Sequence, residues 1–246
     1  LLETVSTPNN VLAIEYIKAA AEQKADIDFY TVKRRGDSHN STQITSSLAS
    51  ASNIRQLISN NSEIVKYIPE IACKTLKDTI ALGETAELKN NERAILTKLR
   101  SMSRQQLAQL ADITEGLENR LYSAIQTSKS VDEVINSVKT KRYTRSRIRR
   151  LIISALLDID KSYTESLPQY IRVLGFNENG AKLLGKIKKT SQLPIVTKLT
   201  NSISSLTPSA QRMLMLEIKS TDIYNTFTEK IKPCGTEYTD GLVIMK

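Results

Sequence analysis

Apolar residues recur every three or four positions along most of the chain between Ile64 and about Phe227. Four stretches show the spacing most clearly: Ile95/Leu96/Leu99, Leu107/Leu110/Ile113, Leu117/Leu121/Ile125 and Val131/Val134/Ile135/Val138. This spacing gathers apolar side chains on one face of a helix. Residues such as Gly83, Pro194 and Pro208 interrupt it. The pattern therefore predicts a mostly α-helical domain built from helices of ordinary length.

Residues 8–60 have a mixed pattern. The turn at 8–10 precedes apolar residues at helical spacing, and the polar stretch 50–52 precedes a second such group, so each predicts a helix start. Between them, residues 26–32 alternate polar and apolar side chains, which predicts a strand. Residues 36–47 are polar and predict a loop. A short apolar run at 241–244 predicts a C-terminal strand or an extended segment packed on the core.

Charge and composition are those of a basic globular protein. Lys and Arg number 35 against 26 Asp and Glu, which gives a net charge of +9. The longest apolar stretch, residues 151–157, is far shorter than the ~20 residues that span a bilayer. Two cysteines and one histidine exclude a disulfide framework and a multi-histidine metal site. We expect free thiols, a cytoplasmic location, no membrane association and no metal site.

The densest concentration of charge is the basic stretch 139–150, which holds seven basic residues and no acidic one, and so supplies +7 of the net +9. On a helix that starts near Thr144, Arg145 and Arg149 share a face, and such a face neutralises phosphates. The stretch holds no acidic residue that would pair the arginines, and Tyr143 offers a ring for base stacking. We interpret the stretch as a nucleic-acid interface; an ordinary solvated helix face is the alternative.

The stretch from Ser50 to Arg55 is a polar helix start followed by an arginine. Helix N-termini bind phosphate because their first backbone N–H groups lack partners, so Arg55 is a candidate for contacting a polyphosphate. Plain capping by Ser50 or Ser52 is the alternative. The basic loop 33–35 is a candidate for the same site. The sole histidine, His39, is expected to lie in a surface loop and to have no catalytic role. The sequence contains no Walker loop, Gly-x-Ser-x-Gly or paired-carboxylate motif.

Six segments of the chain together resemble one family. They are residues 8–17, 32–34, 50–55, 115–121, 140–150 and 170–177. In this order they are similar to the tRNA(Met) cytidine acetate ligases, which belong to the nucleotidyltransferase superfamily with the His-x-Gly-His motif. The resemblance covers nearly the whole chain and rests on the six segments together.

The resemblance implies both a fold and an activity. Residues 1–62 are expected to form an α/β remnant of a Rossmann-like nucleotidyltransferase domain that binds ATP. Residues 63–246 are expected to form a mostly α-helical tRNA-binding domain with a short C-terminal extended segment. The implied enzyme uses ATP, with Mg²⁺, to activate acetate as acetyl-adenylate, and then acetylates N4 of the wobble cytidine in elongator tRNA(Met). The resemblance implies no obligate protein partner.

The resemblance also assigns residues to two sites. The ATP-binding candidates are Asn10, Lys33, Arg34, Ser52 and Arg55. The tRNA-binding candidates are Lys141, Arg142, Arg145, Arg147, Arg149 and Arg150. No segment matches the His-x-Gly-His motif, so the catalytic residues stay unassigned. Because the chain begins with Leu1 and lacks that motif, we expect it to be the C-terminal part of the enzyme and inactive alone.

Two other functions stay open. A different adenylyltransferase of the same superfamily would share the serine-rich signature that ends in Ile-Arg, here residues 50–55, although most such enzymes lack a long basic helical domain. A non-catalytic RNA-binding module would use residues 64–227 to bind tRNA and keep the α/β piece as a vestige. Acetate-stimulated exchange between ATP and pyrophosphate would distinguish the ligase from both.

Overall fold

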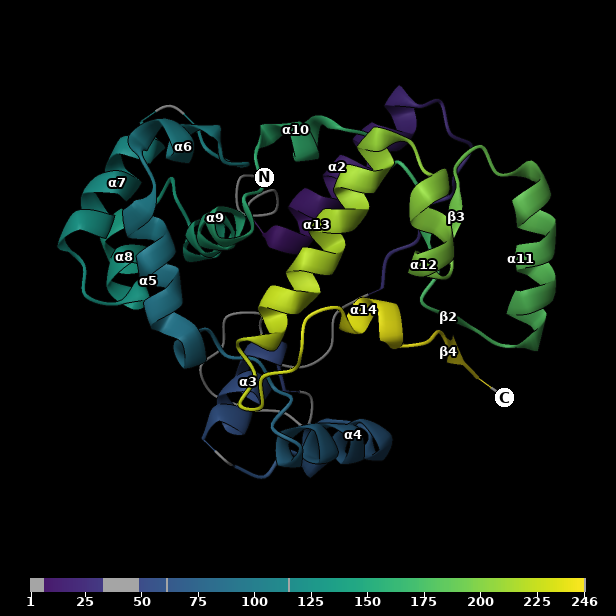
Figure 1. Cartoon of the computed structure of the whole chain (residues 1–246), viewed down its shortest axis with the longest axis horizontal. Helices are drawn as coiled ribbons and strands as arrows, with labels where there is room; N and C mark the ends of the chain where they lie inside the picture. The colour runs from purple at the N-terminus through teal and green to yellow at the C-terminus, as the bar shows by residue number, and fades with distance from the viewer. Residues whose placement is uncertain (1–6, 33–48, 61, 115, 246) are drawn as a thin grey trace. The chain divides into compact units, whose positions relative to one another are not determined.

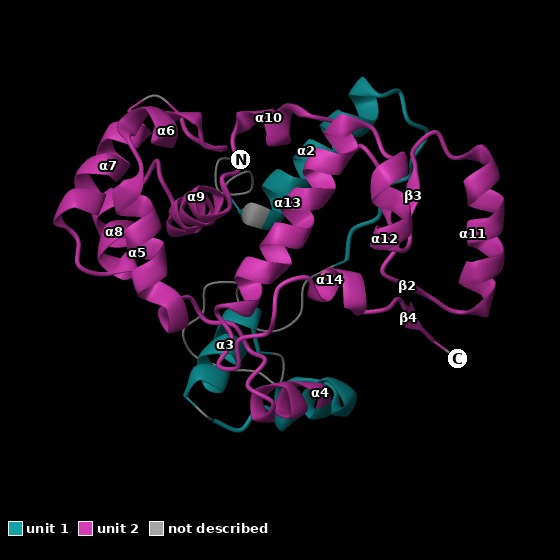
Figure 2. Cartoon of the chain, viewed as in Figure 1, with its two compact units in different colours: residues 1–74 teal, residues 75–246 magenta. Residues whose placement is uncertain are grey.

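A computed structural model describes residues 7–32, 49–60, 62–114 and 116–245 of the chain (Figure 1). The chain divides into two compact units, residues 1–74 and residues 75–246 (Figure 2). The assignment of residues 1–62 to ATP and of residues 63–246 to tRNA stays a prediction.

Unit 1, residues 1–74, is helical where it is described. It contains α2 (Pro8–Glu22), α3 (Ala51–Ser59), the 3₁₀ turn η1 (Val65–Tyr67) and the start of α4 (Glu70–Ala81). α2 begins with a proline, whose fixed φ suits the first helical turn. α3 begins after Ser50, whose Oγ accepts a 3.2 Å hydrogen bond from the Asn53 N–H. Both helices confirm the sequence prediction.

Residues 26–32 form no strand, which corrects the prediction made from their alternating pattern. A strand is stable only when a neighbouring strand satisfies its backbone N–H and C=O groups. Within the described ranges, no other segment pairs with this stretch. Its apolar side chains are therefore exposed, and Tyr30 and Val32 are 87% and 94% exposed. The polar loop that follows, with His39, lies outside the described residues.

Unit 2, residues 75–246, is predominantly helical, as the apolar spacing predicted. Its elements after α4 are η2 (Leu88–Asn91), α5 (Glu92–Ser101), α6 (Arg104–Gln109), α7 (Leu117–Thr127), α8 (Val131–Val138), α9 (Arg145–Leu157), α10 (Lys161–Glu165), β1 (Ile171–Arg172), β2 (Gly175–Phe176), α11 (Glu178–Thr190), β3 (Ile195–Val196), α12 (Leu199–Ser202), η3 (Ile203–Ser205), α13 (Pro208–Asn225), α14 (Thr236–Thr239) and β4 (Val243–Ile244). Two of the predicted breaks lie at helix ends: Gly83 follows α4 with a φ of +69°, and Pro208 is the first residue of α13.

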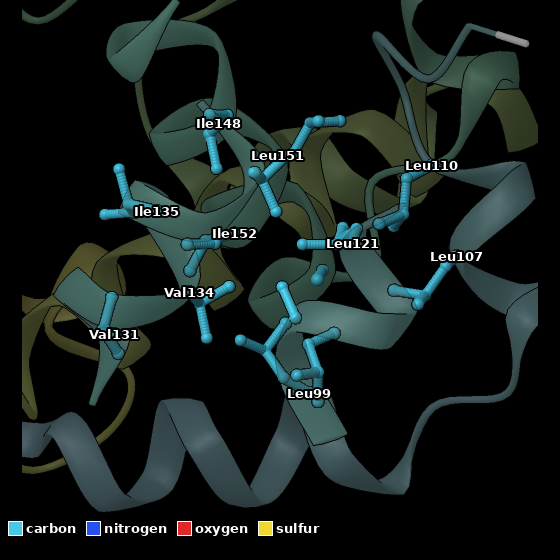
Figure 3. Close-up of a cluster of buried hydrophobic side chains, with 14 of the residues drawn as sticks. Leu99, Leu107, Leu110, Leu121, Val131, Val134, Ile135, Ile148, Leu151 and Ile152 are labelled. Atoms are coloured by element: carbon cyan, nitrogen blue, oxygen red, sulfur yellow. The ribbon is translucent and has the colours of Figure 1, made fainter. Parts of the chain in front are cut away.

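The larger core of unit 2 is made by α5 to α9 (Figure 3). The apolar faces of these helices meet, so that Leu99, Leu121, Ile135, Ile148 and Ile152 are each 1% exposed or less. Full burial of one such side chain stabilises the fold by about 1.5–3 kcal/mol. This packing fixes α8, which precedes the basic stretch, against α9, whose first turns belong to it.

A smaller core lies under α13. Its buried members are Val196, Leu199, Leu206, Ala210, Leu214 and Ile218. Beside it, β1 and β3 pair in parallel, with Ile171 opposite Ile195. Parallel strands need a crossover connection, and α11 lies within that connection.

The C-terminal segment forms the short strand β4, which confirms one of the two predicted forms. It pairs in parallel with β2, and Gly175 lies opposite Val243. A side chain at Gly175 would place its Cβ 2.7 Å from the Val243 carbonyl oxygen, so the close approach requires glycine. The predicted packing of this segment on the core is wrong, because Val243 and Ile244 are 63% and 69% exposed. A two-residue ladder at the surface has no apolar layer to cover it.

The structure bears on two expectations from composition, one about membrane-spanning helices and one about the cysteines. No helix in the described part of the chain is long and apolar enough to cross a membrane. Cys73 is buried, Cys234 is exposed, and both are free, as predicted.

Candidate nucleic-acid interface

The basic stretch 139–150 is a loop followed by the first turns of α9. Thr144 caps the helix, because its Oγ1 accepts a 3.4 Å hydrogen bond from the Arg147 N–H. Within the loop, the Thr140 N–H donates to the Tyr143 carbonyl, and the Tyr143 N–H donates to Thr140 Oγ1, both over 3.0 Å. The helix start predicted near Thr144 is confirmed, and the loop before it is held by its own hydrogen bonds.

Arg120 of α7 joins this loop to the helix before it. Its Nε donates to the Val138 carbonyl and its Nη2 to the Ser137 carbonyl, each over 2.9 Å. These carbonyls lie at the C-terminal end of α8, where a helix leaves acceptors without partners. Sequence analysis gave Arg120 no role, although it lies in the segment 115–121 that carries the resemblance. Its partners lie 17 and 18 residues away, beyond any local pattern.

Arg145 pairs with α8. Its Nη2 donates to Asp132 Oδ1 and its Nη1 to Asn136 Oδ1, both over 2.6 Å. Asp132 and Asn136 are four residues apart and so lie on the same face of α8. This arrangement corrects the expectation that the arginines have no acidic partners, because the partners come from outside the basic stretch.

Arg147 and Arg150 pair with the turn before α7. Arg147 Nη2 donates to the Asp112 carbonyl over 2.7 Å and to Thr114 Oγ1 over 3.2 Å, and Arg150 Nε donates to Asp112 Oδ2 over 2.9 Å. Asp112 has a φ of +65°, a conformation that aspartate tolerates better than most residues. Asp112 therefore accepts hydrogen bonds from two arginines. No local pattern in the sequence marks it.

Tyr143 does not offer its ring to a base, which corrects a second expectation. Its side chain belongs to the larger core and is 8% exposed. The guanidinium groups of Arg142 and Arg147 each lie 5.5 Å from the ring centroid. The Tyr143 ring instead packs in the larger core, just before the start of α9.

Four cations of the stretch remain available. Lys139, Lys141, Arg142 and Arg149 are exposed, and no hydrogen bond or ion pair joins their side chains to any part of the chain that the structure describes. Surface cations that have no ion pair and are held on a hydrogen-bonded loop and a helix can contact phosphates without first breaking a salt bridge. Arg149 also lines a hollow of about 450 Å³ together with Glu87, Leu88, Lys89, Glu92, Val131, Asp132 and Ile135.

The ATP-binding candidates lie in unit 1. Asn10 is half-buried in the first turn of α2, whereas Ser52 and Arg55 are exposed on α3. No hydrogen bond or ion pair engages the Arg55 side chain within the ranges described above. Lys33 and Arg34 lie outside the described residues. Membership of all five residues in one ATP site stays a prediction.

The segment 170–177, which also carries the resemblance, holds a half-buried polar cluster. Arg172 Nη2 donates to Glu237 over 2.9 Å, and its Nε lies 3.3 Å from Glu217. The Tyr170 hydroxyl donates to Glu217 over 2.8 Å. Burial, and then the Glu217 carboxylate, raise the pKa of Tyr170 far above its usual value. These contacts join β1 to α13 and α14, so the cluster has a structural role.

Comparison with known proteins places the chain. The family model described as "HIGH Nucleotidyl Transferase" matches residues 2–238. The chain is 35% identical to the tRNA(Met) cytidine acetate ligase of Acetivibrio thermocellus over 99% of its own length and 62% of that protein's length. Its structure is similar to Thermotoga maritima TmcAL without ligand, with a TM-score of 0.86 and 27% identity over 98% of this chain and 61% of that one. The same protein bound with alpha-thio ATP matches with a TM-score of 0.83 and 26% identity, over 98% and 60% of the two chains.

These similarities confirm the resemblance that the six segments indicated. The chain spans about three fifths of the length of the proteins it matches, 62% of the first and 61% of the second. The similarities also confirm the fold class, a Rossmann-like α/β nucleotidyltransferase domain followed by a mostly α-helical part. Since the family model covers residues 2–238 of 246, the chain belongs to the HIGH Nucleotidyl Transferase family.

Proposed function

We propose that the chain is part of a cytoplasmic ATP-dependent ligase that acetylates N4 of the wobble cytidine in elongator tRNA(Met). One observation carries the proposal: over 99% of its length, the chain is similar to a protein named tRNA(Met) cytidine acetate ligase. In this reaction, an acetate oxygen attacks the α-phosphate of ATP and pyrophosphate leaves. The N4 amine of the cytidine then attacks the carbonyl carbon of acetyl-adenylate, AMP leaves, and the nitrogen loses a proton. Neither step needs a nucleophilic side chain; both need positioned donors that stabilise phosphate charge.

The ATP site is proposed in unit 1. Asn10, Ser52 and Arg55 supply polar and positive groups on α2 and α3, and Lys33 and Arg34 complete the candidate set. The similarity to TmcAL bound with alpha-thio ATP supports ATP as the nucleotide. No group of three or more His, Cys, Asp or Glu side chains converges in the described residues to hold a metal. Mg²⁺ would be carried by the phosphates of ATP, the usual place for this ion in nucleotide sites.

The tRNA site is proposed on the basic stretch 139–150. Its six candidates divide by their surroundings: Lys141, Arg142 and Arg149 are exposed and have no ion pair among the described residues, whereas the other three bond to Asp112, Asp132 and nearby polar groups. The first group supplies phosphate contacts and the second fixes α9 in place. Such contacts give affinity and register on RNA without reading its sequence.

The test uses the full-length protein that contains this chain. We expect exchange of pyrophosphate into ATP that depends on acetate, and transfer of labelled acetyl groups to elongator tRNA(Met). Exchange that depends on another substrate in place of acetate would indicate a different adenylyltransferase. Binding of tRNA with neither exchange nor transfer would indicate a non-catalytic RNA-binding module.

A further inference from the structure

A second concentration of positive charge lies on α11. Its four lysines, Lys182, Lys186, Lys188 and Lys189, are all exposed. None of them has an ion pair or a hydrogen-bonded side-chain partner among the residues that the structure describes. The helix has one acidic residue, Glu178, which lies in its first turn where a negative charge suits the helix dipole. The lysines thus remain uncompensated along the rest of the helix.

Three of these lysines form a stripe along the solvent face. Lys182, Lys186 and Lys189 are four and three residues apart and so lie on one side of the helix, over roughly 10 Å of its axis. Leu184 and Ile187 are half-buried and lie on the opposite side, and α11 packs against β2. The stripe, defined as these three lysines, therefore points away from the body of unit 2, where α11 is an outermost element (Figure 1).

The side of α11 next to the stripe borders a hollow. Lys188 and Lys198 line it, and its volume is about 350 Å³. The remaining lining residues are Phe176, Ala181, Leu184, Gly185, Thr197 and Leu242. Two further cations therefore lie next to the stripe, on a concave surface that can receive a flexible chain.

We propose that the α11 stripe is a second contact surface for tRNA phosphates, separate from the basic stretch 139–150; this inference rests on the proposed tRNA substrate. Lysines that no carboxylate neutralises bind phosphates and release counterions whatever the base sequence. The stripe belongs to the part of unit 2 around the smaller core, on the other side of α13 from α5 to α9 (Figure 1). An RNA with several arms can reach both places at once.

An anionic membrane fits α11 less well. A helix that lies on a membrane presents large apolar side chains, often aromatic, beneath its cationic face. α11 has no aromatic residue, and its apolar side is turned toward β2. The stripe is therefore a surface for a polyanion in solution.

The experiment measures the salt dependence of binding between the full-length protein that contains this chain and an elongator tRNA(Met) transcript. The variant K182Q/K186Q/K189Q removes the stripe and keeps helix propensity, since Gln and Lys are similar helix formers. We expect the slope of log K against log salt to decrease by roughly two units, with one counterion released for each phosphate contact. The matched control K129Q/K161Q/K230Q removes three exposed lysines that have no side-chain partner among the described residues and lie outside α11. Its slope should stay close to that of the unaltered protein.

The variant K182R/K186R/K189R keeps the charge and should bind as the unaltered protein does. If the Gln variant and the unaltered protein give the same slope, the inference that the α11 stripe contacts tRNA is wrong, and the proposed function still stands. Absence of tRNA binding by the unaltered full-length protein overturns the proposed function and the inference with it. Binding of the stripe to anionic phospholipid vesicles, with RNA binding independent of it, assigns the surface to a membrane and overturns the inference.

Discussion

Arg145 of α9 lies 2.6 Å from Asp132 of α8, whereas Arg149, one turn later on the same helix, has no such partner among the described residues. Two arginines that share a helix face therefore have unequal surroundings. The charge of Arg145 is compensated by Asp132, whereas no carboxylate among the described residues compensates that of Arg149. The ion pair holds α9 against α8, and Arg149 stays available to an anion.

We expect the variant K141Q/R149Q to weaken tRNA binding. The slope of log K against log salt should decrease by roughly one to two units, because fewer counterions leave the RNA when two phosphate contacts are lost. The matched variant R145Q/R150Q removes the same charge from arginines that are already paired, so its slope should change less and its Tm should fall. Filter binding at several salt concentrations and thermal unfolding give the two readouts. Equal slopes for the two variants would contradict the division of the stretch into cations that contact phosphates and arginines that are paired within the protein.

In the full-length protein, Arg55→Ala should impair acetate-dependent exchange of pyrophosphate into ATP while tRNA affinity stays nearly unchanged. Arg55 is exposed in the second turn of α3, where a positive charge can reach a polyphosphate. Gln56→Ala, the next exposed position on the same helix, is the control and should leave exchange unchanged. Parallel loss of exchange and tRNA affinity in Arg55→Ala would place Arg55 in a different site.

Arg120→Ala should lower the free energy of unfolding by about 1 kcal/mol, because two carbonyls at the end of α8 lose their donors. It should also weaken tRNA binding by loosening the loop that holds Lys141. Urea unfolding and the binding assay measure both effects. Arg93→Ala, an exposed arginine of α5 without a side-chain partner in the described chain, is the control for loss of charge.

Leu121→Ala should destabilise the protein by about 2–5 kcal/mol, the range for a leucine removed from a packed core. Leu121 is fully buried in the larger core (Figure 3). Leu183→Ala on α11 makes the same chemical change at a side chain that is 55% exposed, and it should cost far less. Similar midpoints of urea unfolding for the two variants would mean that the larger core does not carry the stability.

Asp158 should make stability depend on acid pH. Burial raises the pKa of its carboxyl, but hydrogen bonds and charges from Lys98 and Lys219 outweigh burial and lower the pKa below its usual value. A carboxyl whose pKa is lower in the folded state stabilises the fold above its unfolded pKa, at about pH 4, and this contribution is lost as pH falls through the folded pKa. Asp158→Asn should therefore flatten the loss of stability below about pH 4.

Asparagine also suits the left-handed conformation of Asp158, whose φ is +59°, so the substitution tests charge and not backbone strain. Asp78→Asn, at an exposed position on α4, is the control. An identical acid profile for Asp158→Asn and the unaltered chain would show that the two lysines do not stabilise the carboxylate.

Local sequence predicts the helices well because their signals are local. Apolar spacing marks the buried faces of α5 to α9, and Ser50, Thr144 and Pro208 mark helix starts where the structure has them. The strand predicted at 26–32 failed because a strand also needs a partner, and alternation says nothing of its presence. The same limit applies to β1 to β4, whose two-residue pairings join segments far apart in sequence.

The candidate interface was predictable as a location but not as a set of contacts. Seven basic residues in a row of twelve locate it. Asp112 lies 35 and 38 residues from the arginines it receives, and only the packing of the larger core brings them together. The sequence predicted an exposed ring at Tyr143 because a local pattern does not distinguish an aromatic residue packed in the core from one that is exposed for base stacking.

The pairing of β2 with β4 has a consequence for how the chain opens. The Val243 and Met245 amides donate to carbonyls of the β2 segment at 3.1 Å, and both residues are exposed, by 63% and 56%. The Val173 amide donates over 3.0 Å to the carbonyl of Val196, which is fully buried. In deuterated solvent, the amides of Val243 and Met245 should exchange through local opening of this pairing, while the Val173 amide exchanges only when the smaller core opens. Residues 243–245 can thus detach and return without unfolding either core.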